Sequence, residues 1–178
     1  MKLHLGCGHK KLKGFTNIDI REDVNPDIIA DISYLKEFKS DSVGLIYVCH
    51  VLEHFGRQEY LDILKNWGNI LKPGGTLRIS VPDIESVFLK YQEGVPLRNL
   101  MGFLYGGQTY PENYHYIGFD FKTLKEDLES IGFENVKRWD WRNVEHGHVD
   151  DYSQSYIPHM DKDNGDLMSL NVEAKKRK

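Results

Sequence analysis

The chain has 178 residues, of which 40% are hydrophobic and 28% charged, and its formal net charge is −4 at pH 7. A chain of this length forms one ordinary domain and buries roughly 70% of its unfolded surface. No run approaches the roughly 18 apolar residues of a membrane-spanning helix, and no basic, apolar leader opens the sequence. We therefore expect one soluble, cytoplasmic domain over residues 1–178, with no membrane partner.

The cysteines and the charge balance argue against further classes of protein. Cys7 and Cys49 lie in apolar runs, so we expect buried, reduced thiols and neither a disulfide framework nor a four-ligand zinc site. The acidic balance disfavours broad binding to nucleic acid, although Ala174–Lys178 is basic, as solvated chain ends often are.

The hydrophobic pattern alternates between strands and helices along the chain. Short apolar runs predict strands at Lys2–Leu5, Thr16–Ile20, Ile28–Ala30, Val43–Cys49, Thr76–Val81, Val136–Trp141 and Leu167–Ala174. A period of 3.6 predicts helices over Tyr60–Leu71, Ile84–Tyr91 after a cap at Asp83, and Leu124–Ile131 with a capping box at Thr123–Glu126. This rhythm is typical of an α/β protein with a parallel sheet, and the last two strands suit an antiparallel pair at its edge.

Two segments have weak patterns. Val95–Gly118 is aromatic and glycine-rich, and we expect it to be mostly irregular. Glu145–Asp166 is polar enough for a long surface loop, although its aromatic residues indicate that it packs on another part of the chain. Trp139 and Trp141 alternate with polar residues as strand residues do, which favours packing at the core or the sheet edge.

A glycine loop, Gly6-Cys7-Gly8, follows the first predicted strand, and Asp19 ends the next one. In parallel sheets such glycines let the backbone approach an adenosine-containing cofactor, and such an acid accepts hydrogen bonds from the ribose hydroxyls. A plain tight turn and a turn-capping carboxylate are the alternatives. Asp31 follows the third strand, where its carboxylate would accept from the adenine amine or, with equal weight, cap the next helix.

This loop lacks the features that hold phosphates. The dinucleotide fingerprint requires a glycine where Lys11 stands, and no Gly-Lys-Ser/Thr sequence is present. Only His9–Phe15 separates Gly8 from Thr16, which is too short for a helix whose N-terminus would bind pyrophosphate. S-adenosylmethionine, an adenosine ligand without phosphates, fits better.

Several short motifs follow one another along the chain: Leu3–Gly8, Asn17–Asp19, Val48–Phe55 and Leu71–Asp83, followed by Tyr105–Gly107, His115, Gly118–Asp120, Gly132-Phe133 and Ser169–Ala174. Together they resemble the class I S-adenosylmethionine-dependent methyltransferases, and more narrowly a group of short, type 11-like bacterial and viral methyltransferases. The resemblance spans nearly the whole chain.

The resemblance implies a single-domain, Rossmann-like α/β fold with a mostly parallel seven-stranded sheet, an antiparallel last strand and a minimal N-terminal helical part. It also implies S-adenosylmethionine as cofactor and S-adenosylhomocysteine as product. By this resemblance, Gly6–Gly8 would line the methionine part, Asp19 the ribose, and Asp31 with Ile32 the adenine. The chain departs from the family after Gly8, where the usual first helix is absent.

Histidines are the candidates for the acceptor side. His50 directly follows a buried strand at its carboxyl end, where it would touch the donor and act as a base, or else satisfy loop backbone groups. His115 is the second catalytic candidate, with a surface-loop role equally favoured. Glu53 would orient a neighbour and His54 would pack or cap. Tyr105–Gly107 would form a wall of the acceptor pocket or a simple turn.

A cluster of metal ligands is not expected in the second polar segment. His146, His148 and His159 with Asp150 and Asp151 match no strong ligand spacing, so the sequence predicts solvated loop residues and no metal site.

The sequence leads to the hypothesis of an enzyme that transfers a methyl group from S-adenosylmethionine to a small-molecule or saccharide-like acceptor. The two weakly patterned segments, or a second subunit in a homodimer, would recognise the acceptor. The alternative is a non-catalytic S-adenosylmethionine-binding scaffold or assembly component, motivated by the short Gly8–Thr16 connection. A nicotinamide-dependent oxidoreductase is disfavoured by Lys11 and the missing helix.

Overall fold

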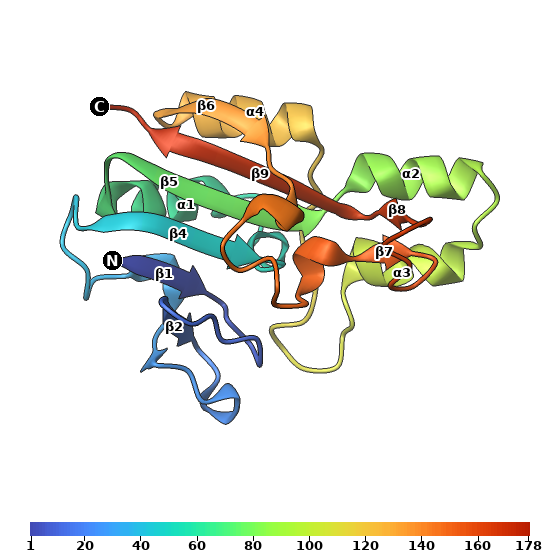
Figure 1. Ribbon diagram of the computed structural model, residues 1–178, viewed down its shortest axis with the longest axis horizontal. Helices are drawn as coiled ribbons and strands as arrows, with labels where there is room; N and C mark the ends of the chain where they lie inside the picture. Colours follow the sequence, from blue (N-terminus) through green and yellow to red (C-terminus); the bar gives the residue numbers. More distant parts are fainter.

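A seven-stranded sheet in the order β3-β2-β1-β4-β5-β9-β6 forms the centre of the computed structural model, which describes residues 1–178 (Figure 1). Its strands are β1 (Lys2–Leu5), β2 (Thr16–Asp19), β3 (Ile28–Ile29), β4 (Val43–Cys49), β5 (Leu71–Pro82), β6 (Phe133–Arg138) and β9 (Ser169–Lys176). Strands β1 to β5 pair in parallel, whereas β9 is antiparallel to both β5 and β6. This confirms the predicted mostly parallel sheet with an antiparallel last strand.

The helices are α1 (Tyr60–Ile70), α2 (Ile84–Gln92), α3 (Leu97–Tyr105) and α4 (Phe121–Ser130). A small hairpin of β7 (Tyr156–Ile157) and β8 (Asp166–Leu167) lies beside α2 and α3, beyond the end of the main sheet (Figure 1). As predicted, no helix joins β1 to β2. None of the four helices combines the length and apolarity that crossing a bilayer requires.

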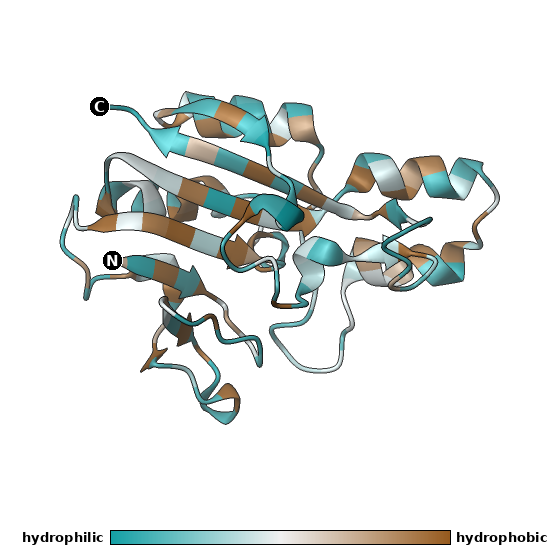
Figure 2. Ribbon diagram, in the orientation of Figure 1, coloured by the Kyte–Doolittle hydropathy of each residue, from teal (hydrophilic) through white to brown (hydrophobic).

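One face of the sheet is aliphatic and forms the main core. Because side chains alternate along a strand, Leu3 and Leu5 of β1 point to the same face as Ile46 and Val48 of β4, and all four are fully buried. Helices α1 and α4 cover this face, and Trp67 of α1 lies in the same core. Figure 2 shows the alternation as brown and teal residues along β5 and β9.

The opposite face of the sheet is polar and has no helix over it. Its buried side chains include His4, Asn17, Tyr47, Ser80 and Asn171. Residues 139–155 cross this face in place of a helix, as the orange segment in front of the strands shows (Figure 1).

Hydrogen bonds hold this covering segment, residues 139–155, on the sheet. The Tyr47 hydroxyl donates to the Asp151 carboxylate over 2.7 Å, and the Asn171 side-chain amide donates to the Ser153 carbonyl over 2.9 Å. The Trp139 indole donates to the Ile79 carbonyl over 3.1 Å. Since buried polar groups are costly when unpaired, these bonds fix both the strands and the segment above them.

The structure adds one helix and corrects the start of another. Val95–Gly118 is mostly irregular, as predicted, but it also contains α3, which the sequence did not predict and whose Leu100 is buried with Val87 and Met168. Leu97, Met101 and Tyr105 of α3 are apolar but exposed. Because apolar residues therefore occur on both faces of this helix, the sequence shows no clear helical period. The capping box at Thr123–Glu126 is wrong, because α4 begins three residues earlier than predicted and its N-cap Asp120 accepts a hydrogen bond from the Thr123 N–H over 2.7 Å.

Another correction concerns the chain after β6. This strand ends at Arg138, so Trp139 and Trp141 do not alternate within a strand, and Trp141 begins a 3₁₀ turn. Glu145–Asp166 is not simply a surface loop: it contains β7, and His146 in it is buried. Its polar composition reflects contact with the polar face of the sheet rather than with solvent alone.

His146 should make the protein sensitive to mild acid. Its ring lies among aromatic rings, 4.1 Å from that of Tyr47, and neither nitrogen has a hydrogen-bond partner. Burial lowers the pKa of His146 to about 4. As pH falls below the ordinary histidine pKa of about 6.5, the unfolded chain binds a proton that the folded chain excludes, so the free energy of unfolding decreases.

Between pH 7 and pH 5, the free energy of unfolding of the parent should therefore decrease by about 2 kcal/mol more than that of His146→Phe. Urea unfolding at the two pH values measures this difference. His148→Phe, at an exposed position two residues along, is the matched control and should leave the parent's pH dependence unchanged. Equal acid sensitivity in the parent and in His146→Phe would contradict the assignment.

Candidate active site

A pocket of about 730 Å³ opens at the carboxyl ends of β1, β2 and β4. This is the edge where ligands bind in open parallel sheets. Residues predicted from the sequence to touch the cofactor all line this pocket: Gly6, Cys7, Gly8, Asp19, Asp31, Ile32 and His50. The strand topology therefore brings together side chains and backbone from four separate segments of the chain.

The glycine loop comes close to the next strand connection. Gly6 has φ +63°, and a Cβ placed there would lie 2.3 Å from Cγ2 of Val51, so a side chain would clash as well as strain the backbone. The Gly8 N–H donates to Asp19 Oδ2 over 2.8 Å, and the Arg21 N–H donates to Oδ1 over 3.0 Å. Asp19 thus acts as a turn carboxylate, and each of its oxygens has a further lone pair for a ligand in the pocket.

Asp31 caps the following turn and also lines the pocket. Its carboxylate accepts hydrogen bonds from the Ser33 N–H over 2.9 Å and the Ser33 hydroxyl over 2.6 Å. The adjacent Ile32 carbonyl accepts from the Trp67 indole over 2.8 Å, which ties this part of the wall to α1. The capping interpretation of Asp31 is therefore confirmed, and the residue also lines the pocket; its contact with adenine stays a prediction.

His50 is held rigidly at the end of β4. Its backbone is left-handed, with φ +52°, and its N–H donates to the Ser80 carbonyl. Nε2 lies 3.0 Å from the Ser169 hydroxyl, and Nδ1 lies 3.3 Å from Oε1 of Glu53. Burial lowers the pKa of His50 to about 3, so at neutral pH it presents an uncharged imidazole to the pocket.

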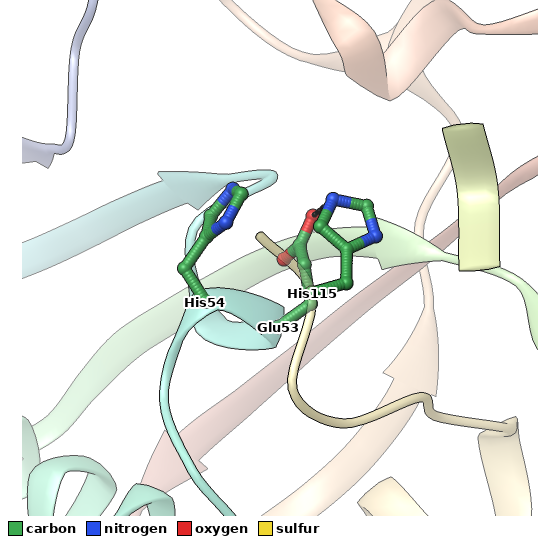
Figure 3. Close-up of side chains that lie close together, drawn as sticks. All are labelled: Glu53, His54 and His115. Carbon is green, nitrogen blue, oxygen red and sulfur yellow. Dashed lines mark ion pairs between the residues drawn. The ribbon is translucent and has the colours of Figure 1, made fainter. Parts of the chain in front are cut away.

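Glu53, His54 and His115 form a cluster next to His50 (Figure 3). Glu53 is fully buried and neither of its carboxylate oxygens has a hydrogen-bond partner, and burial raises its pKa to about 8. His115 Nε2 lies 3.9 Å from Glu53 Oε1, and the rings of His54 and His115 are 4.9 Å apart. His54 lines the pocket, whereas His115 does not.

The two weakly patterned segments of the sequence supply the outer wall of the pocket. Residues 110–116 contribute Tyr110, Pro111, Glu112 and Tyr116, and residues 150–160 contribute Asp150, Asp151, Tyr152, His159 and Met160. Tyr105–Gly107 does not line the pocket, because Gly106 packs against the backbone of Asn113.

The sequence missed two features of this site. It identified Glu53, but only as a residue that orients a neighbour, and it had no signal that His115 would lie against this carboxylate. The contact arises because the Tyr116 N–H donates to the Glu53 carbonyl over 2.8 Å, which brings the segment after α3 onto the 3₁₀ turn Leu52–His54. Periodicity cannot detect a backbone bond between irregular segments so far apart.

Comparison with known proteins identifies a sequence family model and solved structures that are similar to this chain. Residues 13–79 match the model of a methyltransferase domain. No curated protein sequence matches the chain. A S-adenosylmethionine-dependent methyltransferase from Archaeoglobus fulgidus has a TM-score of 0.61 at 19% identity, over 98% of this chain and 85% of that one. Another from Thermotoga maritima has a TM-score of 0.63 at 13% identity, over 99% and 82% of the two chains.

The chain therefore has the fold of these S-adenosylmethionine-dependent methyltransferases, and its residues 13–79 resemble a methyltransferase domain. A third structure, from Listeria monocytogenes, has the same fold, with a TM-score of 0.58 at 17% identity over 99% of this chain and 91% of that one.

Cys7 should be unreactive although it borders an open pocket. Burial, reinforced by the Asp19 carboxylate, raises the pKa of the Cys7 thiol to about 11. At pH 7.5 the thiolate fraction of Cys7 is then roughly 100-fold lower than that of an ordinary cysteine, or lower still. Only the thiolate is nucleophilic, so the reaction should slow in proportion. In a Cys49→Ser background, which leaves Cys7 as the single cysteine, we expect iodoacetamide to react with Cys7 correspondingly slowly.

Mass spectrometry of the time course at several pH values measures this reaction. The rate should rise about tenfold per pH unit up to pH 10, as the thiolate fraction rises. Unfolding in urea should restore the rate of an ordinary cysteine. A plateau reached near pH 8 in the folded protein would show that the site does not suppress ionisation.

Proposed function

We propose that residues 1–178 form a single methyltransferase domain that transfers a methyl group from S-adenosylmethionine to a small-molecule or saccharide-like acceptor. The observation that carries this proposal is the pocket at the strand ends, in which Gly6–Gly8, Asp19 and Asp31 face one cavity. Glycines and carboxylates without a phosphate-binding helix suit a donor that carries an adenosine and an amino acid part but no phosphate.

Each part of the donor has a suitable partner in this proposal. The methionine part lies along Gly6–Gly8, where the absence of side chains at the two glycines lets the ligand approach the backbone. The ribose hydroxyls donate to Asp19, and the adenine lies beside Asp31 and Ile32. His50, which is uncharged at neutral pH, avoids placing a second positive charge next to the sulfonium.

The outer wall supports a polar acceptor with apolar faces. Tyr110 and Tyr152 offer aromatic surfaces, while Glu112 and Asp150 offer carboxylates that accept hydrogen bonds from hydroxyl groups. Methyl transfer itself requires the acceptor atom to lie about 3–3.5 Å from the methyl carbon, in line with the departing sulfur. A hydroxyl or ammonium acceptor must also lose a proton, and His50 with His115 are the candidate bases.

The second candidate is a non-catalytic donor-binding scaffold. Two observations favour it: the low pKa of His50 makes it a weak base, and His115 is not part of the pocket lining. A homodimer is part of either proposal, supported by the apolar side chains exposed on α2 and α3, among them Phe88 and Met101.

Calorimetric titration with S-adenosylmethionine and S-adenosylhomocysteine tests donor binding. Hydrogen bonds to a charged group contribute about 1.5–3 kcal/mol, so we expect Asp19→Asn to weaken binding roughly ten- to hundredfold. Asp23→Asn, which removes an exposed acid near the pocket but outside its lining, is the matched control and should bind as the parent does. Absence of binding to either compound would overturn the proposal.

Turnover distinguishes the enzyme from the scaffold. Incubation with the donor and a panel of hydroxylated, amino and saccharide acceptors should yield a methylated product together with S-adenosylhomocysteine. Donor binding without any product across the panel would favour the scaffold.

A further inference from the structure

We propose that Glu53, His54 and His115 bind a first-row divalent transition-metal cation, for which Zn²⁺ is the best match. Each residue offers one ligand atom, and these three atoms all lie within 4.8 Å of one another. Figure 3 shows the Glu53 carboxyl group between the two imidazole rings.

The Glu53 carboxyl group is the first argument, because it has no partner within the protein. Its side chain is fully buried, yet neither Oε1 nor Oε2 accepts or donates a hydrogen bond. His50 Nδ1 and His115 Nε2 are close, at 3.3 Å and 3.9 Å from Oε1, but neither makes a hydrogen bond to it. Buried carboxyl groups are ordinarily paired, neutralised by a proton or bound to a metal, so the carboxylate form of Glu53 lacks a cationic partner in this environment.

The histidine tautomers are the second and independent argument. His54 Nδ1 lies 3.0 Å from the Tyr114 carbonyl, and His115 Nδ1 lies 3.0 Å from the Phe103 carbonyl. A carbonyl only accepts hydrogen bonds, so each Nδ1 must carry the proton. The lone pair is therefore on Nε2 in both rings. Metal-binding histidines show this pattern, in which one nitrogen donates to the protein and the other binds the ion.

The ligand types and their placement indicate the class of cation. Two imidazoles and one carboxylate are the ligands of catalytic zinc sites and of other first-row metals, whereas Mg²⁺ and Ca²⁺ prefer oxygen ligands. Around a tetrahedral Zn²⁺, with bonds of about 2.0–2.1 Å, the ligand atoms lie about 3.4 Å apart. The three atoms must therefore approach one another by up to about 1.4 Å, and their backbone lies in a 3₁₀ turn and an irregular segment.

The site borders the pocket on one side. His54 lines the cavity, so a cation held by three protein ligands has an open position toward it. There the cation would hold an oxygen of the acceptor and lower the pKa of an acceptor hydroxyl, which favours its methylation. This role rests on the proposed function, whereas cation binding itself does not.

Titration of the full chain, after removal of metals with a chelator, tests the binding. We expect one equivalent of Zn²⁺ by calorimetry, and Co²⁺ in its place should give the visible absorption of a site with nitrogen and oxygen ligands. Glu53→Gln and His115→Asn should each weaken Zn²⁺ binding by about 100-fold or more, since each removes one ligand atom. The asparagine can still donate to the Phe103 carbonyl, which keeps the local hydrogen bond.

Controls separate this site from adventitious binding and from misfolding. His148→Asn makes the same substitution at an exposed histidine and should bind Zn²⁺ as the parent does. Circular dichroism must show the same fold in all variants, and Zn²⁺ should raise the melting temperature of the parent and of His148→Asn only. Equal Zn²⁺ binding by the parent and by both cluster variants, or no stoichiometric binding to the parent, overturns the site. Donor titration is a separate measurement, so either proposal can fail without the other.

Discussion

The polar face of the sheet is the constraint on which the rest of the structure depends. A mostly parallel sheet ordinarily carries helices on both faces, because its side chains are apolar on both. Here only one face is aliphatic, and the other buries groups such as His4 and Asn171 that require hydrogen-bond partners. Residues 139–155 supply part of them: they accept hydrogen bonds from the Tyr47 hydroxyl and the Asn171 amide, which positions Asp151 and Ser153, whereas His4 Nδ1 faces Asn17 Oδ1 at 3.2 Å. The pocket wall at Asp151 and Tyr152 is thus fixed by the polarity of the strands beneath it.

The same constraint accounts for the missing helix after β1. Leu12 and Phe15, from the connection to β2, pack in a small cluster with Tyr47 and Trp139. That cluster occupies the place where a helix would cover the sheet, so the glycine loop has no helix N-terminus behind it. The Gly8 N–H is instead bound by the Asp19 carboxylate. An acid that neutralises the loop leaves it unsuited to phosphate, which would be repelled, and suited to a ligand that brings hydroxyl donors.

How far the sequence predicts this structure depends on whether a feature is local. Val43–Cys49 is an unbroken apolar run, and its strand boundaries are correct because nothing outside the run is needed to explain it. The residues at the strand ends were found for the same reason, since a strand end and a glycine are visible in the sequence. Helix α3 was missed because its exposed face is apolar, which obscures the period that identifies a helix. Contact between Glu53 and His115 was missed because it depends on a backbone bond between two irregular segments.

Burial of Glu53 distinguishes a functional cluster from a merely structural one. An unpaired buried polar group costs about 1–3 kcal/mol, and an apolar side chain of similar size at this position would avoid that cost. A structural role would require the carboxyl group to bond its neighbours, yet His54 and His115 each direct a proton to a backbone carbonyl rather than to Glu53. Their unprotonated nitrogens accept hydrogen bonds, and so does the carboxylate form of Glu53. These groups therefore satisfy one another only when the carboxyl group holds a proton, which its raised pKa of about 8 favours, or when a cation lies between them. The arrangement is therefore complete only when an electron-pair acceptor or a proton donor lies between them, at the border of the pocket.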